Sequence, residues 1–341
     1  MVKFNTDSVS GILSAIKGKK NVVIVMHANP DGDAVGSALG LSLILKKMGH
    51  RLTVISPDHI PSFLQWLPAC QDVLLYTKDK TKCRELIGNA DILFGVDFNM
   101  PDRIGKVEKS FLNSRALKIL IDHHPHPGDF VDILISKPAL SSTAELLWYL
   151  FRKLGLLKLM DKDIAEALFT GMLTDTGSFS FSCNDPGTFR IAANLLGFGI
   201  EKDKIHDKVY NNFSFCRMRL MGYCMNNKLE VMHDYHTALI SITAEELKQF
   251  EYQPGDTEGF VNLPLSIAGI RFSALFIERK EHIKISFRSK GDFEVNKFAT
   301  AHFSGGGHKN AAGGQQYNLP LDETLNKFRD LLKQYRELRH D

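Results

Sequence analysis

The sequence has few cysteines, no long apolar segment and almost no excess of charge of either sign. Its five cysteines form no CxxC pair, so a disulfide framework is not expected, and we expect reduced thiols in a cytoplasmic protein. The apolar run from Leu39 to Leu45 contains Ser42 and is far too short to cross a bilayer. The N-terminus lacks the continuous apolar stretch of a signal peptide. The composition therefore predicts no membrane partner.

The charges nearly cancel: 42 Lys and Arg oppose 39 Asp and Glu, which leaves a formal net charge of +3. A protein that binds duplex DNA usually has a pronounced basic patch or stripe, and this balance does not indicate one. The balance does permit a local basic cleft for a small anionic ligand.

The length and the order of the expected elements predict two domains. At 341 residues, 44% of them hydrophobic, the chain can form two buried cores. In the first half, strand-like runs alternate with helix-like segments, which is typical of a largely parallel sheet covered by helices. The expected strands are 21–26, 51–56, 91–96 and 116–121, and the expected helices are 34–48, 141–154, 162–173, 186–197 and 201–226.

After about Leu229 the pattern changes to alternating strands. A two-stranded unit is expected at 230–242, a hairpin of strands 271–278 and 282–288, and a closing amphipathic helix at 321–338. We therefore predict an α/β protein with a parallel-sheet N-terminal domain at 1–200. A helical linker at 201–228 would join it to a smaller α+β domain at 229–341.

An acidic loop follows the first expected strand. His27, Asp31 and Asp33 lie between that strand and the next helix, and ligands of open α/β sheets bind at the carboxyl ends of strands. Two carboxylates held together by the turn at Pro30 and Gly32 would repel each other unless a cation or a proton neutralised them. The alternative is a polar loop in which Asp33 caps the helix.

Further acids and imidazoles come at the ends of other elements. Asp97 follows one expected strand, Asp122-His123-His124 follows the next, and Asp175 follows a helix beside a turn glycine. Mixed His and carboxylate ligands suit Mn²⁺, Zn²⁺ or Fe²⁺ better than Ca²⁺ and tolerate Mg²⁺. Two ions about 4 Å apart are a recurring device for hydrolysing phosphate esters. We therefore predict a metal-dependent phosphoesterase, with His124 either touching the phosphate or supporting a ligand from behind.

A glycine-rich segment lies near the C-terminus, at Gly305-Gly306-Gly307-His308. Consecutive glycines let backbone N–H groups approach an anion closely, and a helix starting at 310–312 could point its N-terminus at that anion. A glycine-rich loop alone is weak evidence, because many such loops are merely flexible. Together with Lys309 and with Arg288 on a nearby expected strand, it predicts a grip for phosphate and sugar.

These motifs, in this order, resemble the four signature motifs of the DHH phosphoesterases, and the glycine-histidine segment resembles the hallmark of the DHH-associated C-terminal domain. The resemblance spans essentially the whole chain and looks like the NrnA-type group of oligoribonucleases and pAp phosphatases. It implies a catalytic, metal-binding DHH domain with a five-stranded parallel sheet, a linker helix and a substrate-binding domain.

The resemblance also implies roles for individual residues. His27, Asp31 and Asp97 would hold one divalent ion, and Asp33, Asp97, His123 and Asp175 the other, with Mn²⁺ expected and Mg²⁺ as the alternative. Asp122 would orient the ligand histidines, and His124 would contact the scissile phosphate.

For the substrate, the resemblance implies contacts from Arg288, Gly305, Gly306, Gly307 and His308. Arg103 is a weaker candidate, with a surface ion pair as the alternative. Residues 98–100 depart from the smaller residues of the family, which makes Asp102 a second choice of ligand.

The expected substrates are short single-stranded RNA, hydrolysed to mononucleotides, and the small nucleotide pAp, dephosphorylated to AMP. A homodimer is one expected assembly of the protein. The alternatives are hydrolysis of a cyclic dinucleotide or its linear product, such as c-di-AMP or pApA, and a non-catalytic nucleotide-binding module. Pyrophosphatase chemistry is disfavoured because pyrophosphate has no nucleoside for the glycine-histidine segment to grip.

Overall fold

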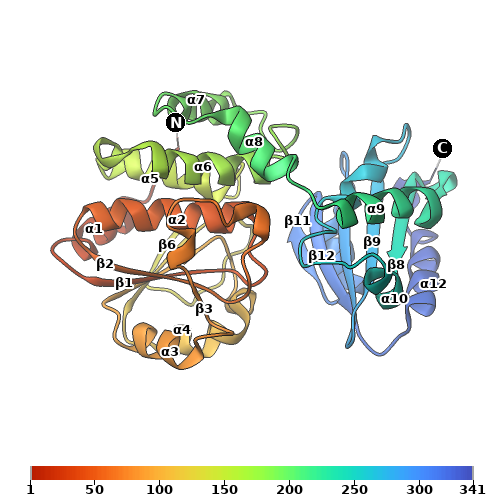
Figure 1. The fold of residues 1–341 in the computed structure, drawn as a ribbon, viewed down its shortest axis with the longest axis horizontal. Coiled ribbons are helices and arrows are strands. Elements are labelled where there is room, and N and C mark those ends of the chain that lie inside the picture. Colours follow the sequence, from red (N-terminus) through yellow and green to blue (C-terminus); the bar gives the residue numbers. More distant parts are fainter. Residues whose placement is uncertain (1, 340–341) are drawn as a thin grey trace. The chain divides into compact units, whose positions relative to one another are not determined.

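The computed structural model describes residues 2–339, which form two compact units. The first unit is Met1–Asn212 and the second is Phe213–Asp341. The break falls inside the stretch predicted as a linker. That stretch contains two helices, α8 (Lys202–Tyr210) and α9 (Phe215–Tyr223), where a single helical run was expected. Each unit contains its own sheet (Figure 1).

The first unit is built on a parallel sheet of six strands in the order β3-β2-β1-β4-β5-β6. The resemblance implied five strands, and the structure corrects this number. The strands are β1 (Asn21–Met26), β2 (Arg51–Ser56), β3 (Leu74–Leu75), β4 (Ile92–Val96), β5 (Leu117–Asp122) and β6 (Ile133–Ser136). β3 and β6 were not predicted, because runs of two and four residues are too short to show a period.

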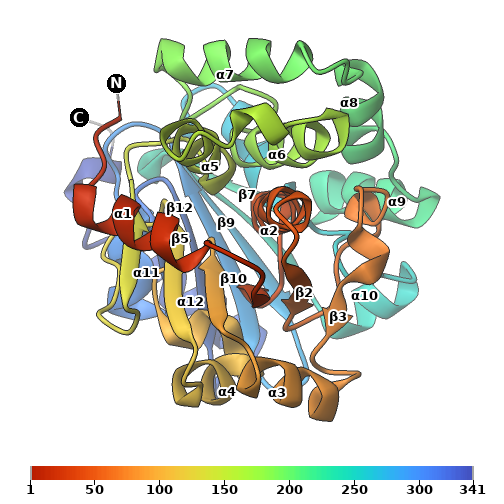
Figure 2. The ribbon, with the colours of Figure 1, turned by 90° about the vertical axis from the view of Figure 1, so that its left-hand side faces the viewer.

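Helices cover both faces of this sheet (Figure 2). Val22, Ile24 and Met26 of β1 join the core under α2, α5 and α6, whereas Val23 and Val25 join the core on the side of α3 and α4. Both faces are therefore apolar, as a buried parallel sheet requires. The helices are α1 (Thr6–Ala15), α2 (Gly32–Lys47), α3 (Lys80–Gly88), α4 (Glu108–Asn113), α5 (Thr143–Lys153), α6 (Lys162–Asp175) and α7 (Pro186–Leu196).

Helices α2 and α6 approach each other unusually closely, through glycines spaced one turn apart on α2. A Cβ added to Gly36 would lie 2.3 Å from the Ala167 carbonyl oxygen, and one added to Gly32 would lie 2.3 Å from the Thr174 hydroxyl. A Cβ at Gly40 would lie 2.8 Å from the Leu168 side chain. These glycines therefore bring the start of α2 against the end of α6.

The strand order places the carboxyl ends of β1 and β4 side by side at the switch point of the sheet. β1 connects outward to β2 on one side, and the chain returns to β4 on the other. Met26 pairs with Val96 in the register, so His27 and Asp97 follow adjacent strand ends. Switch points are where open α/β sheets bind ligands.

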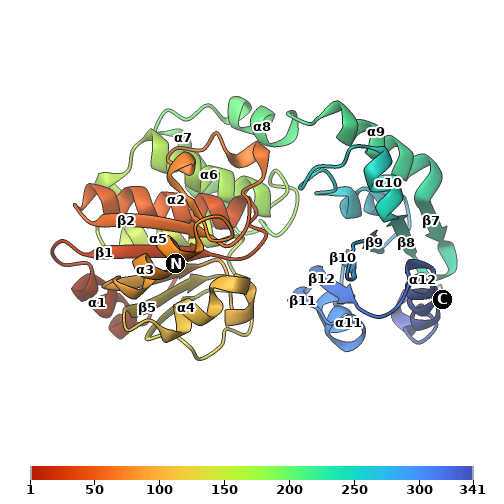
Figure 3. The same cartoon turned by 60° about the horizontal axis from the view of Figure 1, so that its bottom comes forward.

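The second unit is a mixed six-stranded sheet in the order β11-β12-β10-β9-β8-β7, in which only β8 and β9 run parallel. Helices α11 and α12 cover one face over a phenylalanine-rich core, and α9 and α10 pack on the other (Figure 3). The elements are β7 (Leu229–Met232), β8 (Thr237–Ile242), α10 (Ala244–Gln249), β9 (Phe272–Glu278), β10 (Ile283–Ser289), α11 (Val295–His302), β11 (Gly306–His308), β12 (Ala311–Gln316) and α12 (Leu321–Leu332).

The glycine-rich segment forms a hairpin of β11 and β12, so the helix expected to start at 310–312 is wrong. A Cβ at Gly305 would lie 2.1 Å from the Gly313 carbonyl oxygen. Gly307 has a φ of 144°, and a Cβ there would lie 2.5 Å from the Ala311 carbonyl oxygen. These two glycines are therefore needed for the close approach of the two strands.

Candidate metal centre

The acidic loop after β1 is held by the start of α2. Asp31, not Asp33, is the N-cap of this helix, and its Oδ1 accepts the backbone N–H groups of Asp33 and Ala34, both at 3.0 Å. The reading of Asp33 as a cap is therefore wrong. The cap fixes the Asp31 carboxylate while leaving its side chain about half exposed.

Asp33 is instead buried against the N-terminus of α5. Its Oδ2 accepts the Thr143 N–H at 2.6 Å, and its Oδ1 accepts the Ala144 N–H at 2.9 Å. The Ser37 hydroxyl donates a third bond at 3.2 Å. The two unpaired N–H groups at the N-terminus of α5 therefore bind one Asp33 oxygen each and fix the orientation of the carboxylate.

Asp97 lies at the centre of the cluster. It is 1% exposed, and its φ of 64° places it in the left-handed region, which Asp tolerates better than most residues. Its Oδ2 lies 3.5 Å from His27 Nε2, its Oδ1 lies 3.7 Å from His123 Nε2, and Oδ1 also accepts the Thr143 hydroxyl at 2.8 Å. The two oxygens of Asp97 thus face two different histidines.

The backbone fixes the orientation of His27 and His123. His27 Nδ1 lies 2.9 Å from the Ala28 carbonyl oxygen, and His123 Nδ1 lies 3.2 Å from that of Leu140. Since a carbonyl oxygen only accepts, each Nδ1 must carry the proton. In a neutral ring Nε2 then presents a lone pair, and both Nε2 atoms point at carboxylate oxygens. Such facing acceptors need a cation or a proton between them.

The spacing of these atoms fits a cation. His27 Nε2 lies 3.7 Å from Asp31 Oδ1, and His123 Nε2 lies 3.8 Å from Asp33 Oδ2 and 3.2 Å from Asp175 Oδ2. Two ligands at about 2.1 Å from one ion are about 3.0 Å apart in octahedral and about 3.4 Å apart in tetrahedral geometry. The donor atoms of each of two groups lie within 4.8 Å of one another, namely His27, Asp31 and Asp97, and Asp33, His123 and Asp175.

The pKa shifts of His27 and Asp33 also favour positive charge in the cluster. Burial alone would lower the pKa of His27, but hydrogen bonding to Asp31 and Asp97 raises it to about 10. Burial and the neighbouring carboxylates of Asp97 and Asp175 raise the pKa of Asp33. Without a metal the cluster therefore takes up protons, as expected of a set of buried ligands.

Asp122 and His124 form a hydrogen-bonded pair beside Asp97, whose Oδ1 lies 3.8 Å from His124 Nδ1. Asp122 is fully buried, and its Oδ1 accepts the His124 Nδ1–H at 2.7 Å while its Oδ2 accepts the His124 backbone N–H at 3.1 Å. Asp122 was expected to orient the ligand histidines. Among the described residues its carboxylate holds His124, whereas the Leu140 carbonyl orients His123. This contact occupies the Nδ1 nitrogen of His124.

Thr143 was missed at the sequence level, although it touches two of the candidate ligands. The available signal was Ser142-x-x-Glu145 before an apolar run, which is typical of a helix N-terminus. Ser142 caps α5, and the buried Glu145 accepts from Ser141 and Thr188. The pattern locates the end of α5 but does not reveal that this end contacts Asp33 and Asp97.

The candidate substrate residues of the second unit share one face of its sheet. Arg288 on β10 and His308 on β11 both pair with Ala311 of the intervening β12. Directly opposite residues of neighbouring strands lie on the same face, so the two side chains flank Ala311. Gly306 lies on this hairpin with only the Thr300 hydroxyl within 4 Å of an added Cβ, whereas Gly305 and Gly307 serve the strand pairing.

The two further candidates, Arg103 and Asp102, are both exposed. Arg103 is exposed in the 3₁₀ segment Pro101–Val107, and among residues 2–339 no carboxylate lies within ion-pair distance of it. Its carbonyl oxygen accepts the Ala28 N–H at 2.7 Å, which ties this segment to the His27 loop. Asp102 is exposed and belongs to none of the potential ligand groups of the described residues.

Comparison with known proteins agrees with this architecture. Residues 21–172 match the DHH family, N-terminal domain, and residues 234–337 match the DHHA1 domain. A parallel sheet with buried His and Asp clusters at its switch point, followed by such a second domain, defines a metal-dependent phosphoesterase. No helix among residues 2–339 is both long and apolar enough to cross a membrane.

The chain is similar to several proteins over its whole length. An exopolyphosphatase-related protein from Bacteroides fragilis shares 41% identity with a TM-score of 0.94, over 99% of each chain. The bifunctional oligoribonuclease and PAP phosphatase NrnA of Thermus thermophilus is 30% identical over 96% of this chain and 93% of its own. The cyclic-di-AMP phosphodiesterase PdeA of Listeria monocytogenes is 26% identical over 92% of this chain and 48% of its own length. The chain therefore belongs to the DHH family of phosphoesterases.

Proposed function

We propose that this phosphoesterase hydrolyses short oligoribonucleotides to mononucleotides and removes a phosphate from pAp, with two divalent cations bound. The full-length similarity to a bifunctional oligoribonuclease and PAP phosphatase supports this substrate class. The observation that carries the two-ion arrangement is Asp97, whose two oxygens face His27 and His123 separately.

In this proposal His27, Asp31 and Asp97 would hold one ion, and Asp33, Asp97, His123 and Asp175 would hold the other. The expected metal is Mn²⁺, and bound metal would supply activation of the attacking water and neutralisation of phosphate charge. Thr143 holds Asp97 in position through its hydroxyl. The N–H groups of α5 hold both oxygens of the Asp33 carboxylate in position.

His124 would act on the substrate rather than on the metal. Asp122 accepts the Nδ1–H of His124 and so fixes the orientation of the ring. A hydrogen-bond donor held in this way would stabilise the negative charge that develops on the phosphate in the transition state. In the second unit Arg288, His308 and the glycines of the β11–β12 hairpin would bind the rest of the nucleotide, and Arg103 would add a phosphate contact.

A second candidate is hydrolysis of a cyclic dinucleotide or its linear product, which the similarity to a cyclic-di-AMP phosphodiesterase favours. Inorganic polyphosphate also belongs among the substrates to be tested, because the Bacteroides fragilis protein is described as exopolyphosphatase-related. Both candidates would use the same ligand cluster, so the substrate has to be distinguished by turnover.

The test is a parallel product assay with Mn²⁺. The protein is incubated with dinucleotide RNA, pAp, cyclic di-AMP, polyphosphate and pyrophosphate, and products are separated by chromatography. We expect dinucleotide RNA and pAp to be consumed fastest. Faster turnover of cyclic di-AMP or polyphosphate would overturn the proposed substrate, and Mn²⁺ binding without any turnover would show a non-catalytic nucleotide-binding protein.

A further inference from the structure

One face of β10 and β12 carries side chains that are exposed or half-buried within residues 2–339. Along β10 the core residues Ile283, Ile285 and Phe287 alternate with Lys284, Ser286 and Arg288, which are exposed or half-buried. On β12 the residues opposite that second set are likewise exposed or half-buried: Ala311, Gly313 and Gln315. We call these six residues the open strip.

Beyond the ends of the strands, the strip continues to three larger side chains, Arg279, His282 and Tyr317, which we call the row. His282 precedes β10 and Tyr317 follows β12, and their rings lie 5.6 Å apart. Arg279 faces His282 across the tight turn, its N–H donating to the His282 carbonyl oxygen at 2.9 Å. Tyr317 is 46% exposed, and its hydroxyl donates to the Gln315 side chain at the end of the strip. An aromatic and cationic row thus ends the strip.

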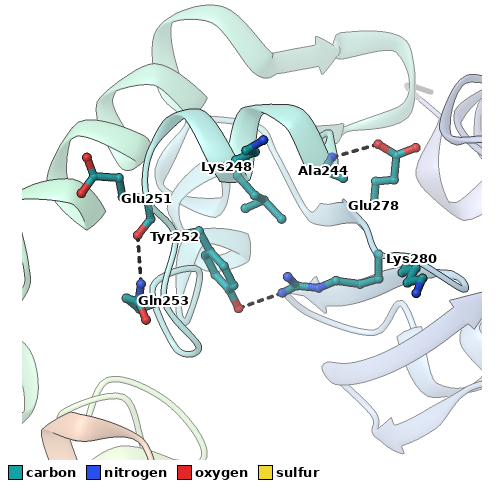
Figure 4. A pocket seen from close by; sticks show the side chains of 9 residues that line it. Ala244, Lys248, Glu251, Tyr252, Gln253, Glu278 and Lys280 are labelled. Carbon is teal, nitrogen blue, oxygen red and sulfur yellow. Dashed lines mark hydrogen bonds between the residues drawn. The ribbon is translucent and has the colours of Figure 1, made fainter.

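A cavity of about 400 Å³ lies beside this row, between α10 and the β9–β10 turn. Figure 4 shows the Tyr252 ring projecting toward the turn that carries Lys280. The Arg279 guanidinium donates to the Tyr252 hydroxyl at 2.8 Å and lies 4.7 Å from the centre of its ring. The cavity is also lined by Lys248, and its size is in the range of small-ligand sites.

The charges along this path suit an anion. The strip and the row carry Lys284, Arg288 and Arg279, and the one carboxylate in the turn between Arg279 and His282 is that of the exposed Glu281, beside Lys280. In the cavity, Glu251 and Glu278 partly offset Lys248, Arg279 and Lys280, and Glu278 accepts the N–H of Ala244 at the start of α10. Cations along a groove together with exposed aromatic rings are the features that bind single-stranded nucleic acid through its phosphates and base faces.

The length of the path sets which substrates would use it. Arg288 and His282 are six positions apart on one strand, which corresponds to about 20 Å. At about 3.4 Å per phosphate when stacked, this distance accommodates about six nucleotides, and fewer when the strand is extended. A dinucleotide held near Arg288 and His308 would not reach Tyr317.

We propose that Arg279, His282 and Tyr317, with the adjoining Tyr252 cavity, form a second RNA subsite that binds the distal nucleotides of substrates longer than a dinucleotide. This inference rests on the proposed function, since it assumes that RNA is the substrate. In this proposal, the end of the sheet opposite Arg288 and His308 binds the part of an RNA that extends beyond a dinucleotide. The subsite should contribute to long substrates and leave short ones unaffected.

Direct binding tests the subsite without turnover. The dissociation constant of a fluorescently labelled seven-nucleotide RNA is measured by anisotropy on the full-length protein in EDTA, for wild type, Tyr317→Ala and Arg279→Ala. Removing one stacking partner should weaken binding about tenfold. The matched control is Lys297→Ala, which removes an exposed cation from α11 on the opposite face and should bind like wild type. Unchanged binding by both subsite variants, or an equal loss in Lys297→Ala, would overturn the proposal.

Hydrolysis then separates this proposal from the proposed function. With Mn²⁺, Tyr317→Ala and Arg279→Ala should lower kcat/KM for the seven-nucleotide RNA about tenfold and leave the dinucleotide within twofold of wild type. An equal loss on both substrates would contradict a distal subsite. If wild type binds the long RNA through Tyr317 and Arg279 but cleaves neither RNA, the proposed function fails and the subsite stands.

Discussion

Gly36→Ala tests whether the close contact of α2 and α6 builds the metal centre. The added Cβ would lie 2.3 Å from the Ala167 carbonyl oxygen and 3.0 Å from the Gly171 nitrogen, both backbone atoms. Ordinary contact starts at 3.4 Å, so the helices must separate by about 1 Å. Overpacking of this kind costs about 1–3 kcal/mol, which exceeds the gain of about 1 kcal/mol from replacing a helical glycine. Because both clashing atoms belong to the backbone, we expect a cost near the upper end of that range, and a net fall in the free energy of unfolding of up to about 2 kcal/mol.

The substitution should also lower activity, because the same movement separates Asp33 on α2 from Asp175 at the end of α6. Both tryptophans, Trp66 and Trp148, lie in the first unit, so their fluorescence during urea unfolding reports that unit. The matched control is Gly88→Ala at the end of α3, where an added Cβ meets nothing within 4 Å. That variant should be as stable as wild type or more stable.

The result that would refute this reasoning is a Gly36→Ala protein that unfolds at the same urea concentration as wild type and turns over substrate at the same rate. It would mean that α2 and α6 are not held at the separation from which the ligand geometry follows. A loss of stability in Gly88→Ala of the same size would equally remove the argument, because the effect would then not depend on the contact.

Four further substitutions test other parts of the account. Thr143→Val removes the hydroxyl that donates a hydrogen bond to Asp97, and loss of such a supporting contact should weaken Mn²⁺ affinity about tenfold. Thr143→Ser keeps the hydroxyl and should keep the affinity. Equal Mn²⁺ affinity of Thr143→Val and wild type in a titration would show that Thr143 does not support Asp97. Asp97→Ala should abolish turnover at saturating metal, and a rate above about a tenth of wild type would count against a shared ligand. Asp161→Ala removes the N-cap of α6 and should cost about 1 kcal/mol in urea unfolding, whereas Asp161→Asn keeps the cap and loses only the ion pair with Lys47. Burial opposes the shift, but the Lys47 hydrogen bond lowers the pKa of Asp161, so the stability difference between wild type and Asp161→Asn should shrink as pH falls through that folded-state pKa. His308→Ala should mainly raise KM, and an unchanged KM for both dinucleotide and pAp would show that the hairpin is not a substrate grip.

Strands and helices with a sufficiently long run of patterned residues could be predicted from the sequence. β1, β2, β4 and β5 were expected within one residue of their observed bounds, because β-branched runs buried on both faces have few other interpretations. It also identified His27, Asp97 and His123, since polar residues directly after such strands must gather at one sheet edge. The roles of these residues remain predictions until a metal is measured.

Contacts between distant segments could not be predicted in the same way. Asp31 and Asp33 are equally good caps by residue type, and the choice depended on α5 supplying N–H groups to Asp33 across 110 residues. The role of Thr143 follows from that same contact. The glycine segment was read as a loop leading into a helix, whereas Gly305 and Gly307 are required by strand backbones at 2.1 and 2.5 Å, a constraint that composition alone does not show.

Anomalous diffraction from crystals grown with Mn²⁺ tests the central claim most directly. We predict two anomalous peaks about 4 Å apart, one beside His27 and Asp31 and the other beside Asp33, His123 and Asp175, with Asp97 bound to both. A single peak, or two peaks that do not share Asp97, would contradict the account.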